Sequence, residues 1–217
     1  TLEDALARIV GGDPRLVVAG RTDAGVHALG QVVAFDSTAT IPGERWKMAV
    51  NTYLPDDIQV LASSLAGADF NPRFQALSKQ YTYYIYRRDA GRVMFRNYAL
   101  CTRVPLDLAA MREAAALIVG RRNFRAFCAS GSSAKTFERR LMKCMVEEKG
   151  PFLSLKVEAD GFLYNMVRIV MGTLMEVGQG KYPAQRVEEI LLSQDRTLAG
   201  PTAPPQGLYL RRVIYPD

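Results

Sequence analysis

Apolar residues recur at helical spacing in several stretches of the chain. In the first ten residues they lie three or four positions apart, which predicts an amphipathic helix that ends before Gly11. The same spacing predicts four further helices, over 44–54, from Pro105 and Asp107 to about Val119, over 162–177 with an interruption at Gly172, and over 184–193.

Other stretches are typical of β-strands. Residues 79–87 carry four tyrosines, and their alternation places Lys79, Tyr81, Tyr83 and Ile85 on one face. Charge-flanked apolar runs at 137–147 and 152–158, joined by Gly150 and Pro151, predict a hairpin. Shorter strands are expected at 16–19, 31–36, 58–61 and 208–215.

Helices and antiparallel strands therefore mix along the whole chain, which predicts an α+β fold. We place a boundary before Pro105, between an N-terminal half, 1–104, and a C-terminal half, 105–217. We expect two similar α/β halves, each with a mainly antiparallel sheet flanked by helices.

Composition narrows the class of protein. Hydrophobic residues make up 48% of the 217 positions, enough for a substantial core, and no uncharged apolar run is long enough for a transmembrane helix. The three cysteines are odd in number and widely spaced, which predicts neither a disulfide framework nor a zinc site and favours a reducing, cytoplasmic compartment. The single histidine, His27, excludes histidine-rich metal sites.

The net charge is +6, which is compatible with a polyanionic partner. The basic residues gather locally and alternate with aromatic residues. Such a surface is either a solvated basic face or a phosphate-binding one, and the aromatic residues favour RNA. The clusters are Arg87, Arg88, Arg92 and Arg96, then Arg121, Arg122 and Arg125, then Lys135, Arg139, Arg140 and Lys143.

The loop from Gly20 to Gly30 lies between two predicted strands and contains Asp23. Its glycines permit backbone angles that other residues avoid, so the loop could present this aspartate to a ligand. From the residues alone, an aspartate in such a loop is more often a turn former or a cap.

The string GRTDAGVHALGQVVAF, residues 20–35, resembles the signature of the TruA family of pseudouridine synthases. Further resemblances follow in the family's order: Arg73-Phe74 with Ala76 and then KQYTY at 79–83, FLYNMVR at 162–168, DRT at 195–197 and APPQGLYL at 203–210. Members of the family normally begin earlier, with a strand and a tryptophan-containing loop, so we expect the first strand of the N-terminal half to be missing.

The resemblance implies that Asp23 is the catalytic residue. Pseudouridine formation breaks the glycosidic bond of uridine, turns the base and rejoins it through carbon, so neither a cofactor nor a metal is expected. The aspartate would attack the ribose, attack the base or remove a ribose proton, and all three roles require a carboxylate. Arg168 matches the arginine that would stabilise this charge, and its place in an apolar helix favours a buried ion pair.

The resemblance assigns substrate-binding roles to three further residues. Tyr81 would stack on the target base and help to move a proton, Leu208 would pack beneath the base, and Arg21 would assist base flipping or hold a phosphate. We interpret Tyr83 as a packing residue and His27 as a support of the loop. Some family members have histidines where Tyr164 and Asn165 stand, so neither residue is given a role here.

The implied partner is tRNA, modified in the anticodon arm at nucleotides thirty-eight to forty by a homodimer. We expect Asp23 and Tyr81 from the first half to meet Arg168 and Leu208 from the second in a cleft between the halves. Two alternatives remain open: a non-catalytic RNA-binding module, and a metal-dependent nuclease, whose activity a chelator would abolish. The second predicts clustered carboxylates, but Asp23 is alone in its loop.

Overall fold

The computed structural model describes residues 1–216, which form two compact units. The first consists of Thr1–Gly20 and Val32–Gln75, and the second of Arg21–Gln31 and the chain from Ala76 onward. The Asp23 loop therefore belongs to the second unit. The boundary predicted between residues 104 and 105 lies inside this unit, and the division into two similar halves stays a prediction. Asp217, the last residue of the predicted C-terminal half, lies outside the described residues.

The first unit is built around two helices, α1 (Leu2–Val10) and α2 (Trp46–Asn51). Ala5 and Leu6 of α1 pack with Trp46 and Val50 of α2 as its buried core. Strands β1 (Val17–Val18) and β3 (Val33–Ala34) pair antiparallel beside them. The predicted helix 1–10 is confirmed, and it ends at Gly11, whose φ of 72° favours glycine. The predicted helix 44–54 is shorter, because its start is the 3-10 turn Gly43–Arg45.

The strand predicted at 58–61 is wrong. The N–H of Val60 donates to Oδ1 of Asn51 at 2.7 Å, and Nδ2 of Asn51 donates to the carbonyl oxygen of Val60 at 2.9 Å. One side-chain amide thus satisfies both backbone groups that a neighbouring strand would have paired. Residues 58–61 therefore join no sheet among the described residues.

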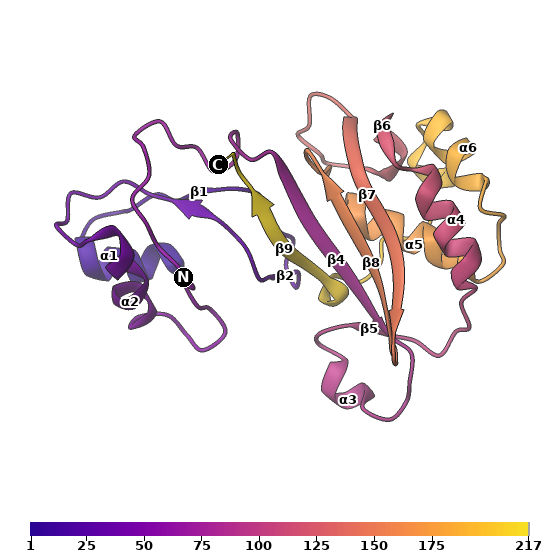
Figure 1. Cartoon of the computed structure of the whole chain (residues 1–217), viewed down its shortest axis with the longest axis horizontal. Helices are drawn as coiled ribbons and strands as arrows, with labels where there is room; N and C mark the ends of the chain where they lie inside the picture. The colour runs from indigo at the N-terminus through magenta and orange to yellow at the C-terminus, as the bar shows by residue number, and fades with distance from the viewer. Residues whose placement is uncertain (217) are drawn as a thin grey trace. The chain divides into compact units, whose positions relative to one another are not determined.

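The second unit contains a mixed, mostly antiparallel sheet in the order β2-β9-β4-β8-β7-β6 (Figure 1). At its centre, β4 (Ser78–Tyr86) pairs with β8 (Phe152–Ala159) on one side and β9 (Leu208–Ile214) on the other, both antiparallel. β5 (Leu100–Cys101) runs parallel to the end of β4. The predicted hairpin is confirmed as β7 (Glu138–Lys149) and β8, but β6 (Gly120–Asn123) was not predicted.

Three helices pack together beside this sheet (Figure 1). They are α4 (Leu108–Leu117), α5 (Met166–Gly178) and α6 (Arg186–Ser193), and each matches a predicted helix. The Asp107 side chain caps α4 by accepting from the N–H groups of Ala109 and Ala110. A short helix, α3 (Arg92–Phe95), precedes β5.

Gly172 does not interrupt the helix around it, contrary to the prediction. α5 begins at Met166 and continues through Gly172, which is buried. A Cβ at this position would overlap the carbonyl oxygen of Pro201. The absence of a side chain at Gly172 therefore allows α5 to pack closely against the segment that leads into β9.

The predicted α+β class is confirmed by these helices and mixed, mostly antiparallel sheets. None of the helices within residues 1–216 combines the length and hydropathy that crossing a membrane requires.

Candidate active site

The Asp23 loop is shaped by a tight turn. The N–H of Val26 donates to the carbonyl oxygen of Asp23 at 3.0 Å, and Gly25 has a φ of 82°. A turn with positive φ at its third residue is of type II, which requires glycine or asparagine there. A Cβ on Gly25 would also lie 3.0 Å from Cγ of Pro205. Gly25 thus fixes both the turn and its approach to the segment before β9.

The far side of the loop is attached to β9. Strand β2 (His27–Ala28) pairs parallel with Tyr209 and Leu210. Nε2 of His27 donates to the carbonyl oxygen of Asn97 at 2.9 Å, and its ring stacks on Tyr209 with centroids 4.6 Å apart. These contacts agree with the interpretation of His27 as a support of the loop.

Asp23 forms an ion pair with Arg168 of α5. Nη1 of Arg168 lies 2.9 Å from Oδ2 of Asp23, and the two side chains are only 14% and 28% exposed. The expected pairing is therefore present. Because the arginine binds Oδ2, it does not occupy Oδ1. A carboxylate held in this way can still direct one oxygen toward a substrate.

Arg168 is fixed by two groups that the sequence analysis did not assign to the site. Nη1 also donates to Oδ1 of Asn165 at 2.7 Å, and Nε donates to the carbonyl oxygen of Ala203 at 2.7 Å. Asn165 is the residue before α5 and has a positive φ of 60°. The only sign of Asn165 in the sequence was its place in the FLYNMVR string. The backbone carbonyl of Ala203 could not be recognised from the sequence, because every residue has one.

Tyr81 lies close enough to Asp23 for their charges to interact. The tyrosine is 8% exposed, and its ring meets Phe162 edge to face at 4.9 Å. Burial, and to a lesser extent the negative charge of Asp23, raise the pKa of Tyr81 to about 12. Its hydroxyl therefore keeps its proton at neutral pH.

Leu208 and Tyr83 lie on the neighbouring part of the sheet. Leu208 begins β9, is 6% exposed and pairs in register with Tyr83. The hydroxyl of Tyr83 donates to the carbonyl oxygen of Pro204 at 2.8 Å, and its ring is fully buried. This agrees with the interpretation of Tyr83 as a packing residue. Together with Arg168, it fixes the segment that precedes β9.

Arg21 does not join this group. Its side chain is exposed and makes no hydrogen bond or ion pair with the residues that the structure describes. The structure thus brings together the carboxylate of Asp23, the guanidinium of Arg168 and the Tyr81 hydroxyl, with Leu208 buried on the neighbouring strand. It leaves Arg21 pointing to solvent two positions before the aspartate.

Known proteins of similar sequence show the family of this chain. A family model described as tRNA pseudouridine synthase matches residues 114–216. The chain is 62% identical to tRNA pseudouridine synthase A of Syntrophomonas wolfei over 216 residues, covering 100% of this chain and 87% of the relative. It is 47% identical to the protein of that name from Moorella thermoacetica, covering 97% and 86%, and 43% identical to the one from Geobacillus kaustophilus, covering 99% and 84%. With such identity over its length, the chain belongs to the tRNA pseudouridine synthase A family.

Proposed function

We propose that this protein isomerises uridine to pseudouridine in the anticodon stem-loop of tRNA, at nucleotides thirty-eight to forty, with Asp23 as its catalytic residue. The observation that carries the proposal is the ion pair between Asp23 and Arg168 at 2.9 Å, in a member of this family. The pair stabilises the carboxylate of Asp23 at the start of its turn, and all three possible roles of the aspartate require a carboxylate.

The neighbouring residues would supply the rest of the chemistry. The reaction exchanges a carbon–nitrogen bond for a carbon–carbon bond in the same nucleoside, so it needs no external redox partner. Tyr81 would stack on the base, and its protonated hydroxyl suits proton transfer at the rejoined carbon. Leu208 would form an apolar surface beneath the base. Arg21, exposed and two positions from Asp23, is free to occupy the gap that a flipped uridine leaves.

We further propose that the site lies in a cleft between the halves 1–104 and 105–217 and that the protein acts as a homodimer in the cytoplasm. The meeting of Asp23 and Tyr81 with Arg168 supports the cleft. The free cysteines, Cys101, Cys128 and Cys144, fit a reducing compartment. Sedimentation of the full chain tests the dimer, which requires twice the mass of one chain.

The direct test of the activity is the release of tritium from uridine labelled at carbon 5 in an unmodified tRNA transcript. Isomerisation replaces that hydrogen when the base rejoins through carbon, so the label appears in water. We expect release to continue when a chelator is present. A protein that binds the transcript without releasing tritium would instead be a non-catalytic RNA-binding module.

A further inference from the structure

A hollow of about 930 Å³ in the second unit lies outside the group around Asp23. Its volume is within the range of pockets that bind small organic ligands, roughly 300–1,000 Å³. We name it the Arg125 hollow after the cation at its wall. Its other lining residues include Phe137, Ser130, Asp195, Arg196 and Thr202.

The Arg125 hollow carries an excess of positive charge. The guanidinium of Arg125 stacks on the ring of Phe137 at 5.2 Å and forms no ion pair within residues 1–216. Within the described part of the chain, Arg196 donates only to neutral oxygens, the carbonyls of Ala199 and Gly200 and the hydroxyl of Thr202. The lining thus holds two guanidinium groups and one carboxylate, that of Asp195, and this excess of positive charge would favour an anionic ligand.

Two neighbouring strands extend this charge. β6 is the last strand of the sheet, and its pairing with β7 places Arg121 opposite Arg140 and Arg122 opposite Arg139. Successive side chains of a strand point to opposite faces, so one of these arginine pairs lies on each face of the sheet. Like charges directly opposite each other destabilise a sheet, and an anion bound beside a pair would offset that repulsion. β6 ends at Asn123, two residues before Arg125 in the wall of the hollow. The two residues are also joined by a hydrogen bond, in which Oδ1 of Asn123 accepts from the N–H of Arg125 at 3.0 Å.

The hollow also adjoins the candidate active site. The N–H of Ala129, in its wall, donates to the carbonyl oxygen of Tyr164 at 3.0 Å, and Tyr164 precedes the Asn165 that binds Arg168. Thr202 lines the hollow, and the next residue, Ala203, accepts from Nε of Arg168. A strand of RNA with one nucleotide at Asp23 could therefore place a neighbouring nucleotide here.

We propose that the Arg125 hollow is a second RNA subsite, which binds a nucleotide next to the target uridine. Arg125 holds its phosphate, Phe137 offers an aromatic face, and the arginine pair on one face of β6–β7 contacts the phosphates beyond. Arginine beside an aromatic ring suits the splayed nucleotides by which proteins recognise RNA loops. The inference rests on the proposed function, because it takes the RNA substrate as the ligand.

The test compares Arg125→Gln with Arg186→Gln. Both changes remove one positive charge and an arginine over an aromatic ring, but Arg186 is already paired with Glu189 at 2.6 Å. For Arg125→Gln we expect the Kd for an unmodified tRNA transcript to rise about tenfold and the slope of log Kd against log salt to fall by about 0.7–0.9. KM should rise, whereas kcat should stay within about twofold of wild type. A phosphate contact stabilises the ground state and the transition state equally, so its loss weakens binding without slowing turnover. Arg186→Gln should match the wild type.

A second pair of variants tests the hollow without removing an arginine. Ser130 is an exposed residue of its wall. Ser130→Glu should weaken tRNA binding about tenfold by repulsion, whereas Ser130→Gln, of the same size, should have little effect. Unchanged Kd in both Arg125→Gln and Ser130→Glu, or an equal loss in Arg186→Gln, would overturn the subsite. Absence of tritium release from wild-type protein would instead overturn the proposed activity, and the Kd values would still decide the subsite.

Discussion

Arg168 makes the largest number of specific contacts among the residues of the candidate site. Its guanidinium reaches Asp23, Asn165 and the carbonyl oxygen of Ala203 at once. Such a fork is available only to arginine, because lysine has a single nitrogen on a flexible stem. The charge that faces Asp23 is thus positioned as well as present.

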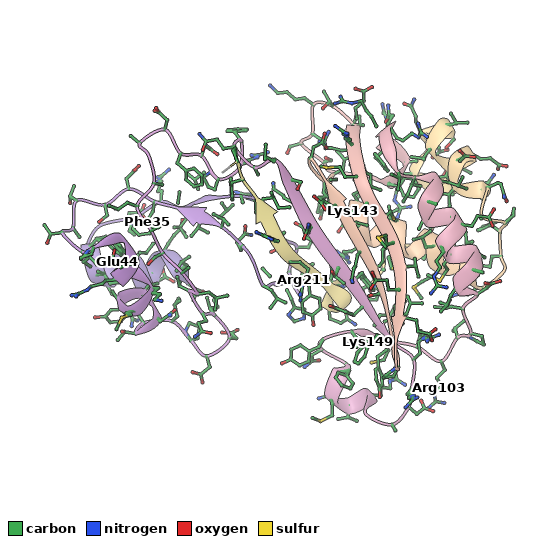
Figure 2. The ribbon with its side chains drawn as sticks, in the orientation of Figure 1. Phe35, Glu44, Arg103, Lys143, Lys149 and Arg211 are labelled. Carbon is green, nitrogen blue, oxygen red and sulfur yellow. The ribbon has the colours of Figure 1, made fainter. Side chains whose placement is uncertain are left out.

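For Arg168→Ala we expect kcat/KM to fall about a hundredfold and the free energy of unfolding to fall by roughly 1–3 kcal/mol. The substitution leaves the carboxylate of Asp23 without its cation. The expected loss in the free energy of unfolding is smaller than for a fully buried pair, because Asp23 is 28% exposed. Arg168→Lys should recover stability better than activity. The matched control is Arg103→Ala, at an exposed side chain labelled in Figure 2. This change removes an exposed ion pair with Asp89 and should change neither quantity much.

Asp23→Asn should abolish tritium release while tRNA binding stays within a few-fold of wild type. The amide has nearly the shape of the carboxylate, but it can act neither as nucleophile nor as base. Turnover and Kd are measured on the same preparation, so misfolding would be visible as lost binding. Turnover at the wild-type rate would rule out Asp23 as the catalytic residue.

Tyr81 should make stability depend on pH in the alkaline range. A tyrosine in the unfolded chain loses its proton near pH 10, whereas folded Tyr81 has a pKa of about 12. The folded state therefore binds more protons between these values, and stability falls as pH rises from 10 to 12. Denaturant unfolding should show that the free energy of unfolding falls between pH 10 and 12 by roughly 2–3 kcal/mol more in wild type than in Tyr81→Phe. Equal falls would contradict the assignment, and Tyr164→Phe, at an exposed tyrosine, is the control.

At the scale of elements, α5 and the segment before β9 pack together and position the side chain of Arg168. Gly172 lets Pro201 approach the helix, and Gly200 lies against Thr173, whose hydroxyl accepts from the N–H of Gly200 at 2.9 Å. The same segment then supplies the carbonyl of Ala203 to Arg168. Packing between a helix and a loop thus determines where the guanidinium lies.

Gly172→Ala should therefore reduce both stability and activity. The added methyl group would overlap a backbone oxygen, which cannot rotate away as a side chain could, so we expect a loss of about 1–3 kcal/mol or more in the free energy of unfolding. Displacement of the segment should also lower kcat. Gly67→Ala, where nothing lies within 4 Å of the added Cβ, is the control for thermal unfolding and turnover. A variant as stable as wild type would show that the segment moves freely.

At the scale of the whole molecule, the net charge of +6 and the arginine clusters predict tRNA binding that weakens steeply with salt. Each phosphate contact should contribute a slope of roughly −0.7 to −0.9 in a plot of log affinity against log salt. Several contacts would give a total slope of several units, measured by titration at different KCl concentrations. A flat response would mean that the clusters are a solvated face.

The sequence by itself determined the elements with a clear period. The helices α1, α4, α5 and α6, the central strand β4 and the hairpin β7–β8 could be predicted because their apolar positions repeat every two or every three to four residues. The pattern predicted a strand at 58–61 wrongly, because the Asn51 side chain takes the backbone groups of Val60. Short pairings such as β2 with β9 have too few residues to show any period.

The sequence also predicted Asp23 as the candidate catalytic residue, because the signature around it is nearly gapless and chemically unusual. The resemblance also implied its pairing with Arg168, but only the tertiary structure showed what holds that arginine in place. Asp23, Arg168 and Ala203 are far apart along the chain, and their contacts depend on the turn at Gly25 and the close approach at Gly172. A backbone carbonyl, a glycine that makes room and a hollow between loops are set by packing in three dimensions, so no residue pattern along the chain could have predicted them.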